Sequence, residues 1–267
     1  MKKEYIVVRG GGDMATGTIH RLCRCGCPVL VLETENPSAI RRKVAFCEAV
    51  FDKTAEIEGI TCVRAEDLAE AEAIMQQGKV ALLVDPQAKI LEGFHPDILI
   101  DAVLAKKNLG TTREMADFTI ALGPGFSAGA DVDCVIETMR GHQLGKIIYQ
   151  GKAMPNTGVP GLIQGIGRER VIHSPARGTI KNRAEISALV EQGEILAMIG
   201  EVPVYASIRG ILRGIIRDGY PVSQGLKIAD IDPRESERDN CFTTSDKARC
   251  IAGSVLEAIL VWKGGRA

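Results

Sequence analysis

The sequence predicts an α/β fold with a second, β-rich domain, and three observations carry that prediction. A glycine turn lies between an apolar run and a segment with helical spacing near the N-terminus. Further apolar runs without polar alternation, at residues 28–32, 80–84 and 98–103, are separated by helical patterns, as in a parallel sheet covered on both faces. In the last third, a pattern of apolar and glycine residues recurs at an offset of 32 residues, which is typical of a duplicated β domain. We therefore predict a Rossmann-like parallel sheet domain, followed by a small barrel-sandwich of the biotinyl or lipoyl type and a C-terminal helix.

The glycine turn is the strongest candidate for a ligand site. Gly10, Gly12 and Ala15 stand in the spacing G-x-G-x-x-A, which lets the backbone approach a pyrophosphate at the N-terminus of a helix. Glu33 ends the next apolar run, where such folds place a carboxylate against a ribose hydroxyl. The predicted cofactor-binding residues of this region are Gly10, Gly11, Gly12, Asp13, Ala15, Gly17 and Glu33. The alternative is that Asp13 caps the helix and the glycines only allow close packing.

Two further groups extend this candidate site. After Asn36 and Pro37 we expect a helix whose Arg41 and Arg42 could neutralise phosphate, although a solvated basic helix face is the commoner explanation. Lys106 follows the apolar run at 98–103, and Gly123 and Gly125 form a second glycine-rich loop that could present backbone N–H groups to an anion. An ordinary crossover between domains is the alternative for that loop.

Glu137, Arg140 and His142 bring a carboxylate, a guanidinium and an imidazole together within six residues. They are weak candidates for catalysis, and a plain polar hairpin tip is an equal alternative. Cys134 is the cysteine nearest to this cluster in the chain, and a thiolate that carries sulfur would need a low pKa and access to solvent.

The eight cysteines do not have metal-ligand spacing. Cys23, Cys25 and Cys27 form a C-x-C-x-C triplet, but no C-x-x-C pair occurs, so neither a zinc ribbon nor a thioredoxin motif is predicted. The triplet could bind a soft metal, or its thiols could fill space where a helix ends at Gly26. We predict no metal site.

Composition excludes several classes of partner. Net charge is −1 and aromatic residues make up 4% of the chain, so no nucleic-acid-binding surface is expected. No apolar stretch reaches the length of a membrane span, and no signal peptide is recognisable. These features predict a cytoplasmic protein without a membrane partner.

The repeat defines the second domain. Val190, Gly193 and Ala197 recur as Val222, Gly225 and Ala229. Carrier domains of this type attach their prosthetic group to a lysine between the halves, but no lysine lies between residues 181 and 227, so a swinging arm is excluded. We predict a nucleotide-binding domain at 1–125, a connecting β segment at 126–169, the duplicated domain at 170–233, and a region at 234–267 whose helix packs back on the first domain or on a second subunit.

Six blocks in order resemble the YqeB family. They begin at Arg9, Ala39, Asp101, Gly123, Glu137 and Asp232 and together span nearly the whole chain. Members of this family are named as accessory factors of selenium-dependent molybdenum hydroxylase systems and are distantly similar to XdhC-type maturation proteins of xanthine dehydrogenase. The resemblance implies a maturation factor that binds molybdopterin or its cytosine dinucleotide form and works with a molybdenum hydroxylase or a sulfur or selenium transferase. It supplies no catalytic residue, and it leaves open whether the chain forms a homo-oligomer.

Two other functions fit the same residues. An NAD(P)-dependent oxidoreductase would hold its dinucleotide at the glycine turn, with His142 or Lys106 as a proton donor. A non-catalytic scaffold would use the β domain to dock a partner enzyme.

Overall fold

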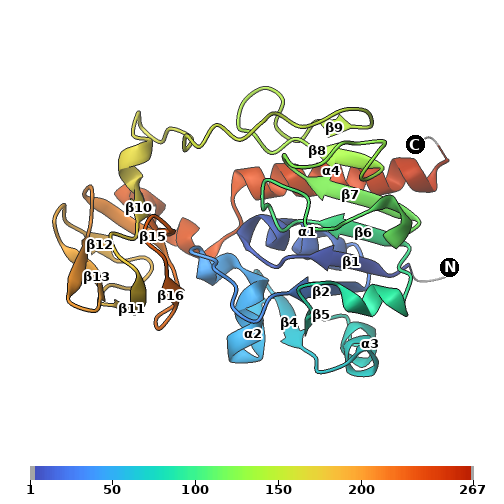
Figure 1. Cartoon of the computed structure of the whole chain (residues 1–267), viewed down its shortest axis with the longest axis horizontal. Coiled ribbons are helices and arrows are strands. Elements are labelled where there is room, and N and C mark those ends of the chain that lie inside the picture. Colours follow the sequence, from blue (N-terminus) through green and yellow to red (C-terminus); the bar gives the residue numbers. More distant parts are fainter. Residues whose placement is uncertain (1–3, 266–267) are drawn as a thin grey trace. The chain divides into compact units, whose positions relative to one another are not determined.

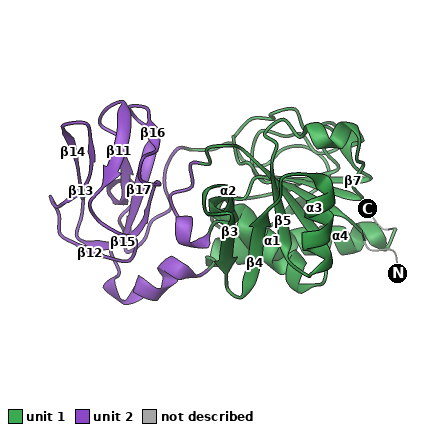
Figure 2. Ribbon diagram, turned by 90° about the horizontal axis from the view of Figure 1, so that it is seen from below, with its two compact units in different colours: residues 1–37, 45–157, 244–267 green, residues 38–44, 158–243 purple. Residues whose placement is uncertain are grey.

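The computed structural model describes residues 4–265, which form two compact units (Figure 1, Figure 2). The first unit contains three segments: the chain up to Pro37, Ala45–Thr157, and the chain from Thr244. The second unit contains Ser38–Val44 and Gly158–Thr243. A single short segment near the N-terminus therefore belongs with the β-rich second unit.

A nine-stranded mixed sheet forms the centre of the first unit. Its strand order is β3-β4-β5-β2-β1-β6-β7-β8-β9. The seven strands from β4 to β8 along the sheet pair in parallel, and the two edge strands pair antiparallel to their neighbours. The strands are β1 (Ile6–Arg9), β2 (Val29–Glu33), β3 (Thr54–Ile57), β4 (Ile60–Arg64), β5 (Val80–Val84), β6 (Ile98–Asp101), β7 (Phe118–Leu122), β8 (Cys134–Ile136) and β9 (Ile147–Ile148).

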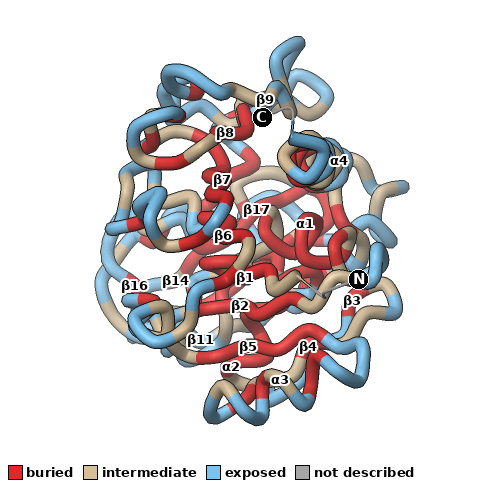
Figure 3. The backbone as a smooth tube through the Cα atoms, turned by 90° about the vertical axis from the view of Figure 1, so that its right-hand side faces the viewer, coloured by how far each residue is buried: buried red, intermediate tan, exposed pale blue. Residues whose placement is uncertain are grey.

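The central strands are apolar on both faces because helices cover both faces (Figure 3). Along β1, Ile6 and Val8 pack with α1 (Asp13–Arg24) and α4 (Asp246–Lys263), whereas Val7 packs with α3 (Leu68–Gln76). A short helix, α2 (Ala49–Asp52), also contributes to the first cluster. The continuous apolar runs in the sequence thus follow from burial on two sides.

The long helices begin and end as helix-capping chemistry requires. Ser245 accepts a hydrogen bond from the Ala248 N–H at 3.2 Å at the start of α4. α1 and α4 approach closely because Gly17 has no side chain: a Cβ atom there would lie 2.8 Å from Cβ of Ala248. α1 ends at Arg24, and Gly26 follows in the left-handed region with φ of 81°.

The second unit consists of two four-stranded antiparallel sheets, ordered β10-β17-β15-β12 and β14-β13-β11-β16. Their strands are β10 (Val171–His173), β11 (Gly178–Asn182), β12 (Leu189–Val190), β13 (Ile195–Ile199), β14 (Val202–Tyr205), β15 (Gly210–Ile215), β16 (Pro221–Val222) and β17 (Lys227–Asp232). β11, β12 and β13 begin 32 residues before β15, β16 and β17. If β11, β12 and β13 are exchanged for β15, β16 and β17, and β10 for β14, one sheet order becomes the other. The duplication therefore relates the two sheets.

Short segments of 3-10 helix complete the secondary structure of the described chain. They span Arg42–Val44, Phe46–Glu48, Lys89–Glu92, Arg113–Met115, Arg168–Arg170 and Glu235–Phe242. In the described part of the chain, no helix is both long and apolar enough to span a membrane.

The predicted fold class needs correction. The large sheet is mixed rather than parallel, because β3 and β9 run antiparallel at its edges. β5 lies between β4 and β2, so the strand order also differs from that of a Rossmann domain. The second unit is built from two separate sheets rather than a single barrel, and it includes Ser38–Val44 from the N-terminal part of the chain. The helix expected after Pro37 is also absent, since the described chain there forms only 3-10 turns.

Candidate functional site

The loops at the carboxyl ends of β1, β6, β7 and β8 lie against one another in the first unit, and glycines make this packing possible. A Cβ atom at Gly10 would lie 3.1 Å from the carbonyl oxygen of Ala102, which follows β6. A Cβ atom at Gly125 would lie 2.6 Å from the amide nitrogen of Lys107, and one at Gly123 would lie 2.6 Å from Oγ1 of Thr138. Four loops from distant parts of the sequence therefore form one continuous edge.

The three glycines of the first turn have different surroundings. Gly10 has φ of 91°, which favours glycine, and Gly11 is pressed against Cys47, whose amide nitrogen would lie 3.0 Å from a Cβ atom at Gly11. Gly12 caps α1 with φ of −66° and ψ of 178°, an extended conformation that any residue adopts. A Cβ atom at Gly12 would meet no atom within 4 Å. The space in front of Gly12 is open, which distinguishes this glycine from its two neighbours.

Glu33 lies at the end of β2, directly beside this turn. Its Oε2 accepts a hydrogen bond from the Gly11 N–H at 2.7 Å, and its Oε1 accepts one from the Thr34 N–H at 2.8 Å. Burial raises the pKa of Glu33, and the two backbone hydrogen bonds counteract part of that effect. The carboxylate is thus oriented by the backbone at the predicted position.

Carboxylates dominate the local field around Gly11. The pKa of the Cys47 thiol is raised well above its ordinary value, first by burial and then by Glu33, Glu48 and Asp13. Asp13 accepts a hydrogen bond from the Met14 N–H at 2.9 Å in the first turn of α1. These contacts make the inner part of the turn unfavourable for an anion.

Lys247 supplies positive charge at this edge, and no motif in the sequence points to it. Burial and the neighbouring Arg140 guanidinium lower the pKa of Lys247, whereas the Asp13 and Glu137 carboxylates oppose that shift. Lys247 lies in the first turn of α4, which approaches α1 through Gly17. Only that helix packing brings a residue near the C-terminus close to the glycine turn.

Arg9 and Asp101, which end the paired strands β1 and β6, form a buried network with Thr111. The Arg9 Nη1 donates to Oγ1 of Thr111 at 2.6 Å, and the Thr111 hydroxyl donates to Oδ2 of Asp101 at 2.6 Å. Arg9 Nη1 and Asp101 Oδ2 are 3.7 Å apart. Since these charged groups satisfy one another, they fix the strand ends and leave ligand contacts to the neighbouring loops.

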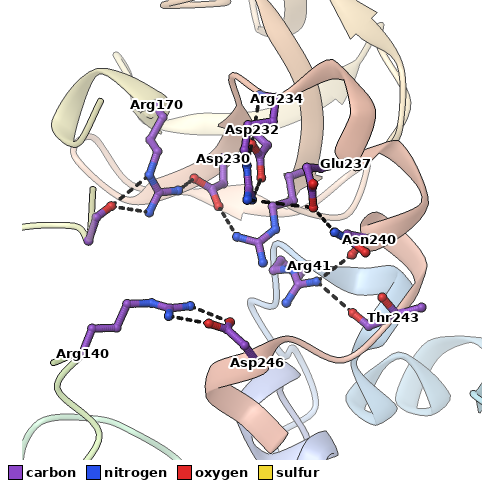
Figure 4. A network of polar contacts seen from close by, with 12 residues as sticks. Arg41, Arg140, Arg170, Asp230, Asp232, Arg234, Glu237, Asn240, Thr243 and Asp246 are labelled. Atoms are coloured by element: carbon purple, nitrogen blue, oxygen red, sulfur yellow. Dashed lines mark hydrogen bonds and ion pairs between the residues drawn. The ribbon is translucent and has the colours of Figure 1, made fainter. Parts of the chain in front are cut away.

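Glu137 and Arg140, near β8, each have hydrogen-bond partners within the first unit. Glu137 is buried, and its carboxylate accepts hydrogen bonds from the N–H groups of Met139 and Met154, both at 2.7 Å. Arg140 forms a bidentate pair with Asp246, with both distances 2.8 Å (Figure 4). Glu137 therefore organises its own loop, and Arg140 binds the start of α4.

His142 and Cys134 stay untested as catalytic candidates. His142 is exposed, whereas Cys134 is fully buried in β8. Burial, followed by the Asp133 carboxylate, raises the pKa of Cys134 to about 12. At neutral pH its sulfur is a thiol rather than a nucleophilic thiolate.

The basic residues predicted to neutralise phosphate lie in two places. Arg41 and Arg42 belong to the second unit, where Arg41 Nη2 donates to the carbonyls of Asn240 and Thr243, both at 3.1 Å (Figure 4). Arg42 Nε donates to the carbonyl of Ile215 at 2.8 Å. Lys106 belongs to the first unit and is exposed in the loop that packs against Gly125. Of the three, Lys106 belongs to the same unit as the glycine turn.

Within residues 4–265, no group of three or more His, Cys, Asp and Glu side chains is arranged to hold a metal ion. Cys25 and Cys250 are exposed, and Cys23 and Cys27 are half-buried. The triplet lies at the end of α1, with Cys25 as its C-cap.

Comparison with known proteins finds a relative in sequence. The chain is 47% identical over 259 residues to the protein YqeB of Escherichia coli (strain K12), an alignment that covers 97% of this chain and 48% of that protein. The chain thus spans about half the length of this relative. No family model matches.

Solved structures give weaker likenesses. They include the product-bound ectoine utilization protein EutE (DoeB) from Ruegeria pomeroyi, at 12% identity and a TM-score of 0.24, covering 85% of this chain and 56% of that one. They also include a succinylglutamate desuccinylase/aspartoacylase from Rhodobacter sphaeroides, at 12% identity and a TM-score of 0.29, covering 87% of this chain and 86% of that one. An aspartoacylase family protein from Mesorhizobium loti has 13% identity and a TM-score of 0.29, with 87% and 86% covered. Likenesses of this size transfer no activity to this chain.

The predicted fold is corrected by the strand pairing described above, in which a mixed sheet and two antiparallel sheets stand in place of a parallel sheet and a barrel-sandwich. The predicted function finds no support in these comparisons. None of the three names given above refers to molybdenum or to cofactor maturation, so the predicted role as a molybdenum-cofactor maturation factor is not supported. The link to XdhC-type proteins and selenium systems also lacks support. What the sequence comparison does support is the predicted YqeB resemblance: over nearly its whole length, this chain is a homologue of about half of YqeB.

Proposed function

We propose that the first unit binds the ribose-phosphate part of a nucleotide or nucleotide-bearing cofactor at the carboxyl ends of β1 and β2. Gly12 carries the proposal. Its conformation suits any residue, and a Cβ atom there would meet no protein atom within 4 Å. Neither backbone strain nor packing requires glycine at this position. A ligand that approaches the backbone at the start of α1 would require it.

Glu33 supports recognition of ribose. Each of its oxygens accepts one backbone hydrogen bond, and an ionised carboxylate has about four acceptor positions. The remaining positions can accept hydrogen bonds from ribose hydroxyls without displacing the Gly11 or Thr34 N–H groups. A hydroxyl group also suits the negative field around Gly11, because it donates a hydrogen bond and carries no charge.

Lys247 supports binding of the phosphate. It is close enough to Asp13 and Glu137 for both carboxylates to raise its pKa, and Asp13 directly follows Gly12. A phosphate in front of Gly12 would therefore interact with the α1 N-terminus and with a lysine that offsets the Asp13 charge. Two of the predicted cofactors, NAD(P) and the cytosine dinucleotide form of molybdopterin, contain the ribose and phosphate that this arrangement accommodates. Their binding would identify a ligand and would not by itself establish a maturation role.

Discrimination between ribose and deoxyribose tests the proposal. Titration calorimetry with CDP, ADP and NAD, each compared with a 2′-deoxy analogue, should show tighter binding of the ribose form of at least one ligand. Glu33→Gln should weaken binding of that ligand about tenfold and remove the discrimination, as expected for a lost hydrogen bond to a charged acceptor. Glu35→Gln is the matched control, because Glu35 is exposed two residues further along the chain. Absence of binding, or equal discrimination in wild type and Glu33→Gln, would contradict the proposal.

A further inference from the structure

We propose that a basic cavity between α1 and α4 binds a small organic anion that carries a phosphate or at least two carboxylates. The cavity lies within the first unit and has a volume of about 450 Å³, within the range of metabolite sites. Its lining residues are Gly17, His20, Arg21, Arg24, Cys25, Thr244, Arg249 and Leu256. None of these described residues is acidic.

One face of α1 supplies the positive charge. Gly17, His20, Arg21 and Arg24 follow the spacing that places residues on the same side of a helix. Arg249 faces them from α4. The cavity therefore has three arginines converging from two helices.

Gly253 gives Arg21 its place in this cavity. A Cβ atom at Gly253 would lie 3.1 Å from Nη1 of Arg21, so the guanidinium lies against the bare backbone of α4. Glycine inside a helix costs about 1 kcal/mol relative to alanine. The absence of a side chain at Gly253 leaves room for the Arg21 guanidinium beside α4.

The charges in the cavity are only partly balanced. Arg249 pairs with Glu58, and His20 Nε2 lies 3.3 Å from the Glu58 carbonyl oxygen. Although burial raises the pKa of Glu58, hydrogen bonds from Thr244 and the pairing with Arg249 hold it below its ordinary value. Glu58 is thus ionised and offsets one arginine, which leaves Arg21 and Arg24 to balance an anion.

This cavity is separate from the glycine turn. Gly12 caps the beginning of α1, whereas Arg21 and Arg24 lie in its last turn. A helix of this length spans roughly 18 Å. Cations in the last turn of a helix also interact favourably with the helix dipole, but that effect requires neither Gly253 nor a cavity.

Cys25 provides a reporter inside the cavity. Its thiol is exposed, whereas burial raises the pKa values of Cys23 and Cys27 and so limits their reactivity. In a Cys250→Ser background, which removes the other exposed thiol, alkylation of Cys25 by iodoacetate and by neutral iodoacetamide can be compared by mass spectrometry. Arg21→Gln should lower the rate with iodoacetate relative to the rate with iodoacetamide by about threefold, as expected for the loss of one positive charge near the surface. Lys89→Gln, an exposed lysine of the same unit, should leave the ratio unchanged.

Competition shows whether the positive charge forms a binding site. At constant ionic strength, inorganic phosphate or succinate should slow the reaction of Cys25 with iodoacetamide in a saturable manner, and Arg21→Gln should weaken that protection. Protection by phosphate alone would indicate a phosphoryl ligand, and protection by succinate alone a carboxylate ligand. If neither anion protects Cys25, or if Arg21→Gln changes neither the rate ratio nor the protection, the proposal is wrong.

Discussion

Two kinds of glycine can be compared, with examples taken from each unit. In the first unit, Gly11, Gly17 and Gly125 lie against neighbouring backbone, so their missing side chains allow elements to approach. In the second unit, the repeat partners Gly193 and Gly225 have φ of 85° and 81°, and a Cβ atom at either would meet nothing within 4 Å. Those two glycines provide a turn conformation and do not provide space.

Gly12 belongs to neither class. It has an ordinary conformation, like Gly11 and Gly17, but open space in front of it, like Gly193. A glycine that neither strain nor contact explains is a better indicator of a ligand than a glycine-rich motif as a whole. The comparison therefore reduces a motif of several glycines to one position that mutation can test.

The largest effect is expected in the second unit, where a buried carboxylate lies between two arginines. Asp230 is buried between Arg170 and Arg213, and Arg170 also donates to the Gly161 carbonyl (Figure 4). Asp230→Asn should lower the free energy of unfolding by about 3 to 5 kcal/mol, because it leaves buried arginine charge without its carboxylate. Urea denaturation measures the change, with the exposed Asp239→Asn as control. Equal stability of the two variants would show that the buried pair does not stabilise this unit.

The next effect compares the two glycine classes directly. Gly125→Ala combines φ of 118° with a Cβ atom 2.6 Å from the Lys107 amide nitrogen, and should cost about 3 kcal/mol. Gly193→Ala has only the unfavourable φ and should cost about 1 kcal/mol. Thermal and urea unfolding of both variants give the comparison. Similar costs would mean that loop packing at the sheet edge tolerates an added methyl group.

A smaller effect should appear as a pH dependence in the second unit. Although burial raises the pKa of Asp232, hydrogen bonds and charge from Arg234 outweigh burial and hold it below its ordinary value. A depressed pKa in the folded state stabilises the protein above the unfolded value, and this stability is lost as pH falls through the folded pKa. Asp232→Asn should therefore lower stability at pH 7 and flatten its decline between pH 5 and pH 2. An unchanged pH profile in the variant would contradict the assignment to Asp232.

The sequence predicts local structure better than the arrangement of strands. The apolar runs that become β1, β2, β5, β6 and β7 and the Ser245 cap of α4 are readable, because burial and capping leave local patterns. The position of β5 between β4 and β2 depends on pairing between distant segments, so it leaves no local signal. The 32-residue offset does show in the sequence, because each repeat keeps its own glycines and apolar positions.

The candidate site divides in the same way. The location of Glu33 beside the glycine turn can be predicted, because this residue ends the next apolar run, and in the structure its carboxylate accepts a hydrogen bond from the Gly11 N–H. The location of Lys247 near the glycine turn cannot be predicted in this way. It depends on the contact between Gly17 and Ala248, which joins two helices from opposite ends of the chain. Arg41 and Arg42 look like phosphate ligands in sequence, yet their hydrogen bonds to carbonyls of the second unit show that they also stabilise that unit.

Gly12→Ser separates folding from ligand binding in a single variant. Serine is a favourable N-cap residue, so the free energy of unfolding should stay the same or rise by up to about 1 kcal/mol. Its side chain should occupy the open space and weaken binding of the ribonucleotide selected by titration by about tenfold or more. Ligand affinity equal to that of the wild type, with stability retained, would show that the space in front of Gly12 is not a binding site.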